Sequence, residues 1–129
     1  MKKSNSSHLY EKNKYVARVK RWLDGDTVEL TVDLGMSVSY DSKFRLARID
    51  APEVKRYSGV SLEEKQRGLA LRASLSEKIP QGTEIIISVT KRGKYGRYLV
   101  EIWDYDEEDL LYNLNDWLLN EGLVEGVSY

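Results

Sequence analysis

Alternating apolar and polar residues mark several short strands along this chain. The alternation runs through 15–22 and 27–32, and the Asp24-Gly25 pair between them is typical of a tight hairpin turn. Further strands are predicted at 44–49, 84–89 and 98–103. The apolar run at 85–87 has no polar interruption, so we expect the strand at 84–89 to be buried on both faces.

Two helices complete the predicted elements. Ser61 with Glu64 three residues later forms a capping-box pattern, and Pro80 ends the helix that it begins. A second helix is predicted at 110–121, with Gly122 as its C-cap. Five strands with a helix between the third and fourth are typical of an OB-fold barrel. We therefore predict a mainly β (α+β) fold, a five-stranded OB-fold barrel with two or three helices.

Composition indicates one folded domain. The chain has 129 residues, of which 41% are hydrophobic and 32% charged. We expect residues 1–13, rich in Lys, Ser and Asn, to be a flexible segment and residues 14–129 to form the domain. There is no cysteine and His8 is the single histidine, which excludes cysteine nucleophiles, thiolate zinc sites and histidine-based triads.

The chain also lacks the hydrophobic segments that membranes require. No apolar run approaches the ~20 residues of a membrane span, and the lysine-rich start has no apolar signal-peptide core. We expect no membrane partner and favour an intracellular protein, with a trimmed secreted form as the alternative. The net charge is −1, but residues 1–21 hold seven basic residues and residues 101–129 hold nine acidic and no basic ones. We interpret the acidic end as a solvated surface.

Catalysis by this composition needs carboxylates, arginines or a metal. Asp26 follows the first turn, and Asp50 and Glu53 flank Pro52 where the third strand ends. Carboxylates at rigid strand ends suit Ca²⁺ or Mg²⁺, although each of these acids, judged singly, is more often a turn residue than a ligand.

Arginines occupy positions that need an explanation. Strict alternation places Arg45 on the face of Ala47, and Arg48 on the face of Leu46. An arginine in an apolar strand must reach solvent or a partner, so both are either edge charges or site residues. Arg97 ends a basic loop with two glycines, which suits either a ligand site or a solvated hairpin tip.

Three motifs together are more specific than any one residue. DGDT at 24–27, FRLARIDAPE at 44–53 and KYGRY at 94–98 follow one another in an order and spacing that resembles the staphylococcal nuclease (thermonuclease) family over residues 14–127. The resemblance implies the same OB-type barrel. It also implies a Ca²⁺-dependent phosphodiesterase that hydrolyses DNA, RNA or both and leaves 3′-phosphate ends.

The resemblance assigns the metal ligands by position. Asp26 and Asp50 match the carboxylates that bind Ca²⁺, and Ala51 matches the residue whose backbone carbonyl binds it. The family usually has Thr at that position, so this chain keeps the carbonyl and loses the hydroxyl. Asp24 matches an acid beside the metal ligands.

The substrate-handling residues follow in the same way. Glu53 matches the proposed general base, and Arg45 and Arg97 match the arginines that contact the reacting phosphate. Three further positions match residues that hold the nucleotide: Lys94, Tyr95 and Tyr129.

The predicted partner is single-stranded DNA or RNA, and we expect a monomer. The alternative function is a non-catalytic OB-fold module that binds nucleic acid or protein. Such a module would hold single strands with a steep salt dependence and leave them uncut.

Overall fold

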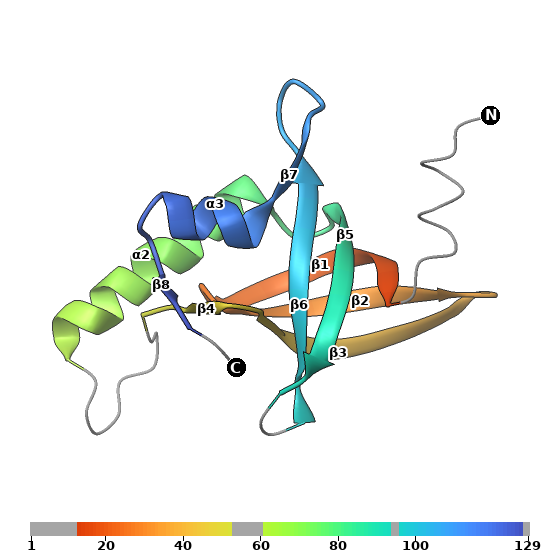
Figure 1. The fold of residues 1–129 in the computed structure, drawn as a ribbon, viewed down its shortest axis with the longest axis horizontal. Helices are drawn as coiled ribbons and strands as arrows, with labels where there is room; N and C mark the ends of the chain where they lie inside the picture. Colours follow the sequence, from red (N-terminus) through yellow and green to blue (C-terminus); the bar gives the residue numbers. More distant parts are fainter. Residues whose placement is uncertain (1–12, 53–60, 94–95, 128–129) are drawn as a thin grey trace.

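A closed barrel of five strands forms the body of the molecule (Figure 1). The computed structural model describes residues 13–52, 61–93 and 96–127. Antiparallel pairing gives the order β3-β2-β1-β5-β6, and a parallel pairing of β3 with β6 closes the barrel. The strands are β1 (Lys14–Asp24), β2 (Thr27–Gly35), β3 (Val38–Leu46), β5 (Glu84–Arg92) and β6 (Tyr98–Tyr105). This arrangement confirms the predicted five-stranded OB-type barrel.

Two helices of the described residues pack on one side of this barrel (Figure 1). The helix α2 (Leu62–Lys78) begins as predicted, because the Ser61 side chain accepts a hydrogen bond from the backbone N–H of Glu64 at 3.0 Å. The helix α3 (Leu114–Asn120) is capped by Asn113, whose side chain accepts from the Asp116 N–H at 2.8 Å. Neither described helix has the length and apolar character that crossing a bilayer requires.

The inward face of each strand and one face of each helix share a single core. Trp22 lies in it with 4% of its surface exposed, and its indole N–H donates to the Ile79 carbonyl just after α2. Burial of this kind is the main source of stability for a domain of this size. The fully buried core side chains include Leu30, Phe44, Leu46, Leu75, Ile85, Ile87, Ile102, Leu114 and Leu118.

The third predicted strand, 44–49, has different limits in the structure. The polar stretch before it is part of β3, which pairs with β2 through a two-residue turn at Met36 and Ser37. Arg48 then adopts a left-handed φ of 70°, and a separate short strand β4 (Ile49–Asp50) follows and pairs with β8 (Glu125–Gly126). Residues 38–43 have a poor hydrophobic pattern and form a strand because they pair with β2. This pairing is not visible in the sequence.

Two further expectations are wrong in detail. Residues 111–113 begin no helix, because β7 (Leu111–Asn113) pairs with the end of β6 before α3 starts. The strand at 84–89 is not buried on both faces: Ile85 and Ile87 face the core, whereas Ile86 is only half-buried. In a barrel one face of every strand points outward, so an apolar run there gains one buried face only.

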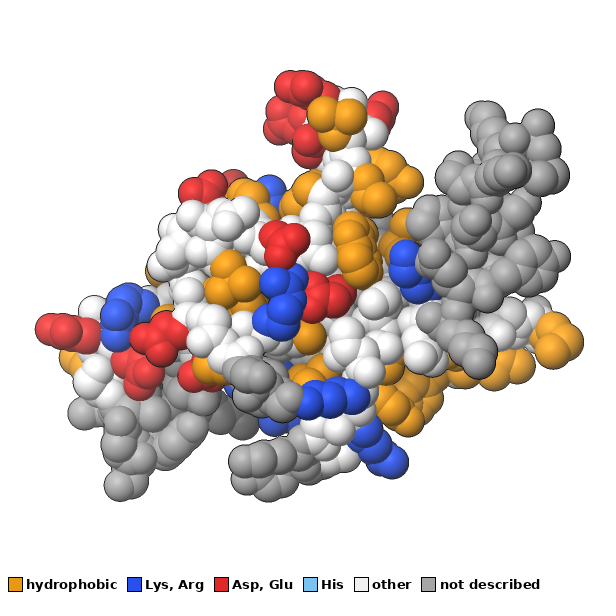
Figure 2. Space-filling model, in the orientation of Figure 1, with side chains coloured by type: hydrophobic (Ala, Val, Ile, Leu, Met, Phe, Trp, Pro, Cys, Tyr) orange, Lys and Arg blue, Asp and Glu red, His pale blue; other side chains and the backbone are white. Residues whose placement is uncertain are grey.

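Charge is unevenly distributed over the surface. Figure 2 shows acidic side chains gathered at the tip of the β6–β7 connection and hydrophobic ones exposed at the far end of the β2–β3 hairpin. The hairpin tip includes Met36, which is 97% exposed. The predicted flexible segment 1–13 lies almost wholly outside the described residues.

Candidate active site

A two-residue turn between β1 and β2 carries the first candidate carboxylates. Asp24 and Thr27 are paired across it, with Gly25 and Asp26 forming the connection. Gly25 is buried because Leu71 of α2 and Ala51 pack against its Cα, leaving no room for a side chain. The sequence therefore has glycine here for a close approach of helix to turn, and the aspartates on either side are held with it.

Asp26 is a buried acid, and both of its carboxylate oxygens accept hydrogen bonds. The residue is 3% exposed, and its Oδ1 accepts from the Thr27 hydroxyl at 2.9 Å while its Oδ2 accepts from the Ala51 N–H at 3.0 Å. Its backbone carbonyl accepts from the Leu46 N–H at 2.8 Å. These bonds tie the turn to β3 and to the residue after β4, so the position of the carboxylate is fixed by three segments of chain.

Arg45 joins two of the predicted metal ligands. Its Nη2 lies 3.2 Å from Asp26 Oδ2 and 3.0 Å from Asp50 Oδ1, and its side chain is 21% exposed. Both carboxylates therefore lie within reach of one guanidinium, although Asp26 comes from the β1–β2 turn and Asp50 from β4. The structure brings together four of the residues singled out from sequence: Asp26, Arg45, Asp50 and Ala51.

Arg97 lies just before β6, the strand that pairs with the end of β3. Its carbonyl accepts from the Gly93 N–H at 2.6 Å, which closes the loop between β5 and β6. Leu99, two residues further on, is the parallel partner of Arg45. Arg97 therefore lies two residues before the strand partner of Arg45. Asp24 is half-buried beside the turn.

Four predicted site residues lie outside the described residues, and the structure therefore does not place them. They are Glu53, Lys94, Tyr95 and Tyr129.

The donor chemistry of the described cluster suits a hard divalent cation. Asp26 and Asp50 supply carboxylate oxygens, Ala51 supplies a backbone carbonyl, and nitrogen or sulfur ligands are not among them. Two carboxylates and one guanidinium also leave the cluster with a net negative charge. Within the described residues no group of three or more acids or histidines could hold a metal by itself. Ca²⁺ here would need ligands from water or substrate, as an open catalytic site requires.

A second charged network is centred on Arg48, between Arg45 and Asp50 in the sequence. The Arg48 Nε and Nη2 donate to the two carboxylate oxygens of Glu101 at 2.8 and 2.6 Å, and Nη2 also donates to Asp116 at 2.7 Å. Hydrogen bonding to Glu101 is the main reason that the pKa of Arg48 lies above its ordinary value. Arg48 is thus a tie between β4, β6 and α3. The sequence left open whether Arg48 reaches solvent or a partner; its side chain is 45% exposed and also pairs with two carboxylates.

Asn115 is a structural residue that the sequence analysis missed. It is fully buried in α3, donates to the carbonyls of Ala47 and Val100 at 2.9 and 3.0 Å, and accepts from the Ile102 N–H at 3.1 Å. It satisfies backbone groups where β3 ends and β6 passes it. A polar residue within an apolar helix pattern is the one local signal of this role.

Comparison with known protein families gives a match to this chain. The family model described as "Staphylococcal nuclease homologue" matches residues 43–128, about two thirds of the chain. The matched region contains Arg45, Asp50 and Arg97, whereas Asp24 and Asp26 precede it. A search of curated proteins found no match.

Proposed function

Because the chain belongs to the staphylococcal nuclease homologue family, we propose that it hydrolyses phosphodiester bonds in single-stranded DNA or RNA with Ca²⁺ as cofactor. The products would end in 3′-phosphate, with the 5′ oxygen as leaving group. The observation that carries this proposal is that Arg45 of β3 lies between Asp26 of the β1–β2 turn and Asp50 of β4. We propose that the protein acts as a monomer.

The two arginines account for binding of the phosphate. Hydrolysis adds negative charge to a group that is already an anion, so donors fixed in advance lower the barrier most. Asp26 and Asp50 hold the Arg45 guanidinium in place, and Arg97 lies just before the neighbouring strand β6. A guanidinium binds two phosphate oxygens at once, which an ammonium cannot do.

A cation held by Asp26, Asp50 and the Ala51 carbonyl would supply positive charge to a phosphate oxygen and help to orient the substrate. Asp24 would support this group from the neighbouring strand. Glu53 is proposed to take the proton from the attacking water, which requires a position in line with the leaving oxygen. Two residues of the basic loop, Lys94 and Tyr95, and Tyr129 near the end of the chain are proposed to hold the rest of the nucleotide.

Cleavage of a labelled single-stranded oligonucleotide by the purified full chain tests the activity. We expect cleavage with Ca²⁺, none with EDTA, and 3′-phosphate on the products. Glu53→Gln and Arg97→Ala should each lower the rate by orders of magnitude. Arg21→Ala, which removes an exposed arginine paired with Glu29, should leave the rate unchanged.

The outcomes separate the proposal from its alternative. Unchanged rates in both Glu53→Gln and Arg97→Ala would reject the assigned roles. Salt-dependent binding of the strand without any cleavage would instead identify a non-catalytic binding module. Calorimetric titration with Ca²⁺ adds a measurement independent of activity: Asp26→Asn and Asp50→Asn should each weaken binding of the ion.

A further inference from the structure

Among the residues that the structure describes, one end of the barrel is open and lined by aromatic rings. A cavity of about 410 Å³ lies there, within the range typical of small-molecule sites. The end is the one at which β1 begins, β2 ends and β6 begins. Buried side chains, among them Val32 and Ile87, form its floor, while Tyr40 at the rim is 43% exposed.

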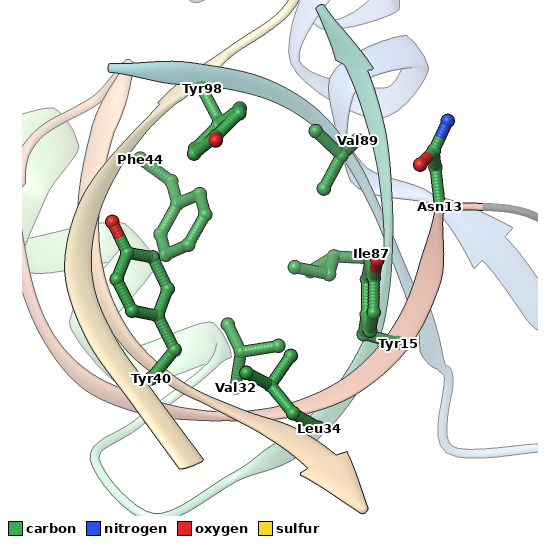
Figure 3. Close-up of a pocket in the computed structure, with 9 residues that line it drawn as sticks. All are labelled: Asn13, Tyr15, Val32, Leu34, Tyr40, Phe44, Ile87, Val89 and Tyr98. Carbon is green, nitrogen blue, oxygen red and sulfur yellow. The ribbon is translucent and has the colours of Figure 1, made fainter. Parts of the chain in front are cut away.

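Four aromatic rings from three strands line the lumen, and those of β3 and β6 contact one another. Tyr40 and Phe44 of β3 are edge-to-face with centroids 6.3 Å apart, and Phe44 stacks on Tyr98 of β6 at 6.4 Å and 28°. Figure 3 shows these three rings along one side of the lumen and Tyr15 of β1 across from them. A flat ring that enters the lumen would therefore meet aromatic faces and edges on both sides.

Charge divides sharply between the lumen and its rim. Every described residue lining the lumen is uncharged. At the rim the Arg92 guanidinium lies 5.5 Å from the centre of the Tyr98 ring, and the exposed Lys43 adjoins Phe44 along the chain. The nearby Asp41 has its carboxylate bound to the Thr31 hydroxyl at 2.6 Å and close to Lys20.

The lumen also adjoins the proposed phosphate site. Phe44 and Arg45 are consecutive in β3, so Phe44 points into the barrel while Arg45 points out to Asp26 and Asp50. Tyr98, which lines the lumen, directly follows Arg97. Each of the two proposed phosphate-binding arginines is therefore next in sequence to an aromatic residue of the lumen.

We propose that this open end of the barrel binds a nucleobase, with Arg92 at the rim close to the attached phosphate. The proposal rests on the proposed function and adds a base site to it. A base is flat and uncharged and stacks on aromatic side chains whatever its identity, while its polar edge can meet the tyrosine hydroxyls. The base comes either from a single strand or from a free nucleotide.

Binding measured in EDTA tests the base site without cleavage. The full chain is titrated with a short single strand and with the same strand carrying abasic sites in place of its bases. We expect the complete strand to bind roughly fivefold or more tightly, since stacking on each ring contributes that much or more. Tyr40→Leu and Tyr98→Leu should abolish this preference, whereas Tyr105→Leu, an exposed tyrosine at the other end of β6, should keep it.

Methyl NMR of the same samples locates the ligand. Signals of Val32, Ile87 and Val89 should shift on addition of the complete strand and stay in place with the abasic one. Equal shifts with a nucleoside 5′-monophosphate would identify free nucleotides as a source, and shifts with the strand alone would identify the polynucleotide. Unshifted methyls, or a base preference that survives in Tyr40→Leu and Tyr98→Leu, would overturn the proposal.

Failure of the base site and failure of the nuclease are distinguishable. Cleavage of a strand with wild-type KM by Tyr40→Leu and Tyr98→Leu would reject the base site and leave the nuclease standing. If the protein cuts no strand but binds bases in a way that requires these tyrosines, the nuclease is rejected and the base site stands.

Discussion

Replacing Gly25 by alanine tests the close approach of helix α2 to the turn that carries Asp24 and Asp26. An alanine Cβ at this position would lie 2.8 Å from Leu71 Cγ and 3.0 Å from Ala51 Cβ, and closer still to Leu71 Cδ2. Carbon atoms in contact normally lie about 3.5–4.0 Å apart. The φ of Gly25 is outside the left-handed region, so crowding, and not backbone strain, sets the cost.

The expected cost is that of overpacking a core. Extra methyl groups in well-packed sites lower the free energy of unfolding by about 1–3 kcal/mol. The Leu71 side chain can rotate away in part, but the Ala51 Cβ is fixed to the backbone, so we expect about 2 kcal/mol. Urea unfolding followed by tryptophan fluorescence should show a lower midpoint with an unchanged slope.

A double-mutant cycle isolates the cause. Leu71→Ala removes the crowding atoms, so Gly25→Ala should cost less in that background, with a coupling of about 0.5–3 kcal/mol. Gly126→Ala is the matched control, because its added Cβ meets Leu119 at an ordinary 3.5 Å. If Gly25→Ala and Gly126→Ala unfold at the same urea concentration, helix and turn are not packed as described and the argument fails.

Three further substitutions test other parts of the structure. Asn115→Ala should lower the free energy of unfolding by more than about 2 kcal/mol, because the Ala47 carbonyl and the Ile102 N–H lose the buried amide, while the Val100 carbonyl loses it but keeps the Ala47 N–H. Arg48→Met should cost about 1.5–3 kcal/mol in urea unfolding, since Glu101 is 13% exposed and loses its charged donor. Burial, followed by the charges of Asp104 and Asp106, raises the pKa of Tyr112 to about 12. The wild type should therefore lose stability at high pH, and Tyr112→Phe should not show this loss.

The sign of the pH effect follows from proton binding. The folded chain keeps the Tyr112 proton to higher pH than the unfolded chain, whose tyrosines have a pKa of about 10. This contribution to stability is complete below pH 10 and is lost as the pH rises through 12. Lys78, whose ammonium is 4.9 Å from the centre of this ring, is present in both proteins, so the comparison is between wild type and variant at each pH.

Matched controls accompany these variants. Arg18→Met removes an ion pair with Glu84 in which both side chains are about 60% exposed, and it should cost less than about 1 kcal/mol. Tyr105→Phe removes an exposed hydroxyl and should leave the alkaline loss of stability as in the wild type. If the Asn115 variant unfolds as the wild type does, Asn115 is not buried as described. If Arg48→Met and Arg18→Met have equal effects, the Arg48–Glu101 pair is not more buried than the Arg18–Glu84 pair.

Part of the candidate site was predictable because its residues lie at the ends of local elements. The hairpin turn and the end of the strand FRLARID were both visible as patterns, and the family resemblance gave Asp26, Arg45 and Asp50 their roles in advance. Their meeting was not visible in the pattern itself. Arg45 reaches both carboxylates because β2 pairs with β3 and because Arg48 breaks the strand and turns Asp50 back.

By itself the sequence determined the number of barrel strands, the first hairpin turn and the start of α2. Period-two alternation, the Asp24-Gly25 turn and the Ser61 cap act over a few residues, so local physics suffices to predict them. Tertiary structure decided the parallel closure of β3 on β6, the pairing that makes a strand of 111–113, and the role of Asn115. It also decided that four aromatic residues distant in sequence share one lumen. These features depend on contacts between residues far apart in the chain, and such contacts leave no periodic trace in it.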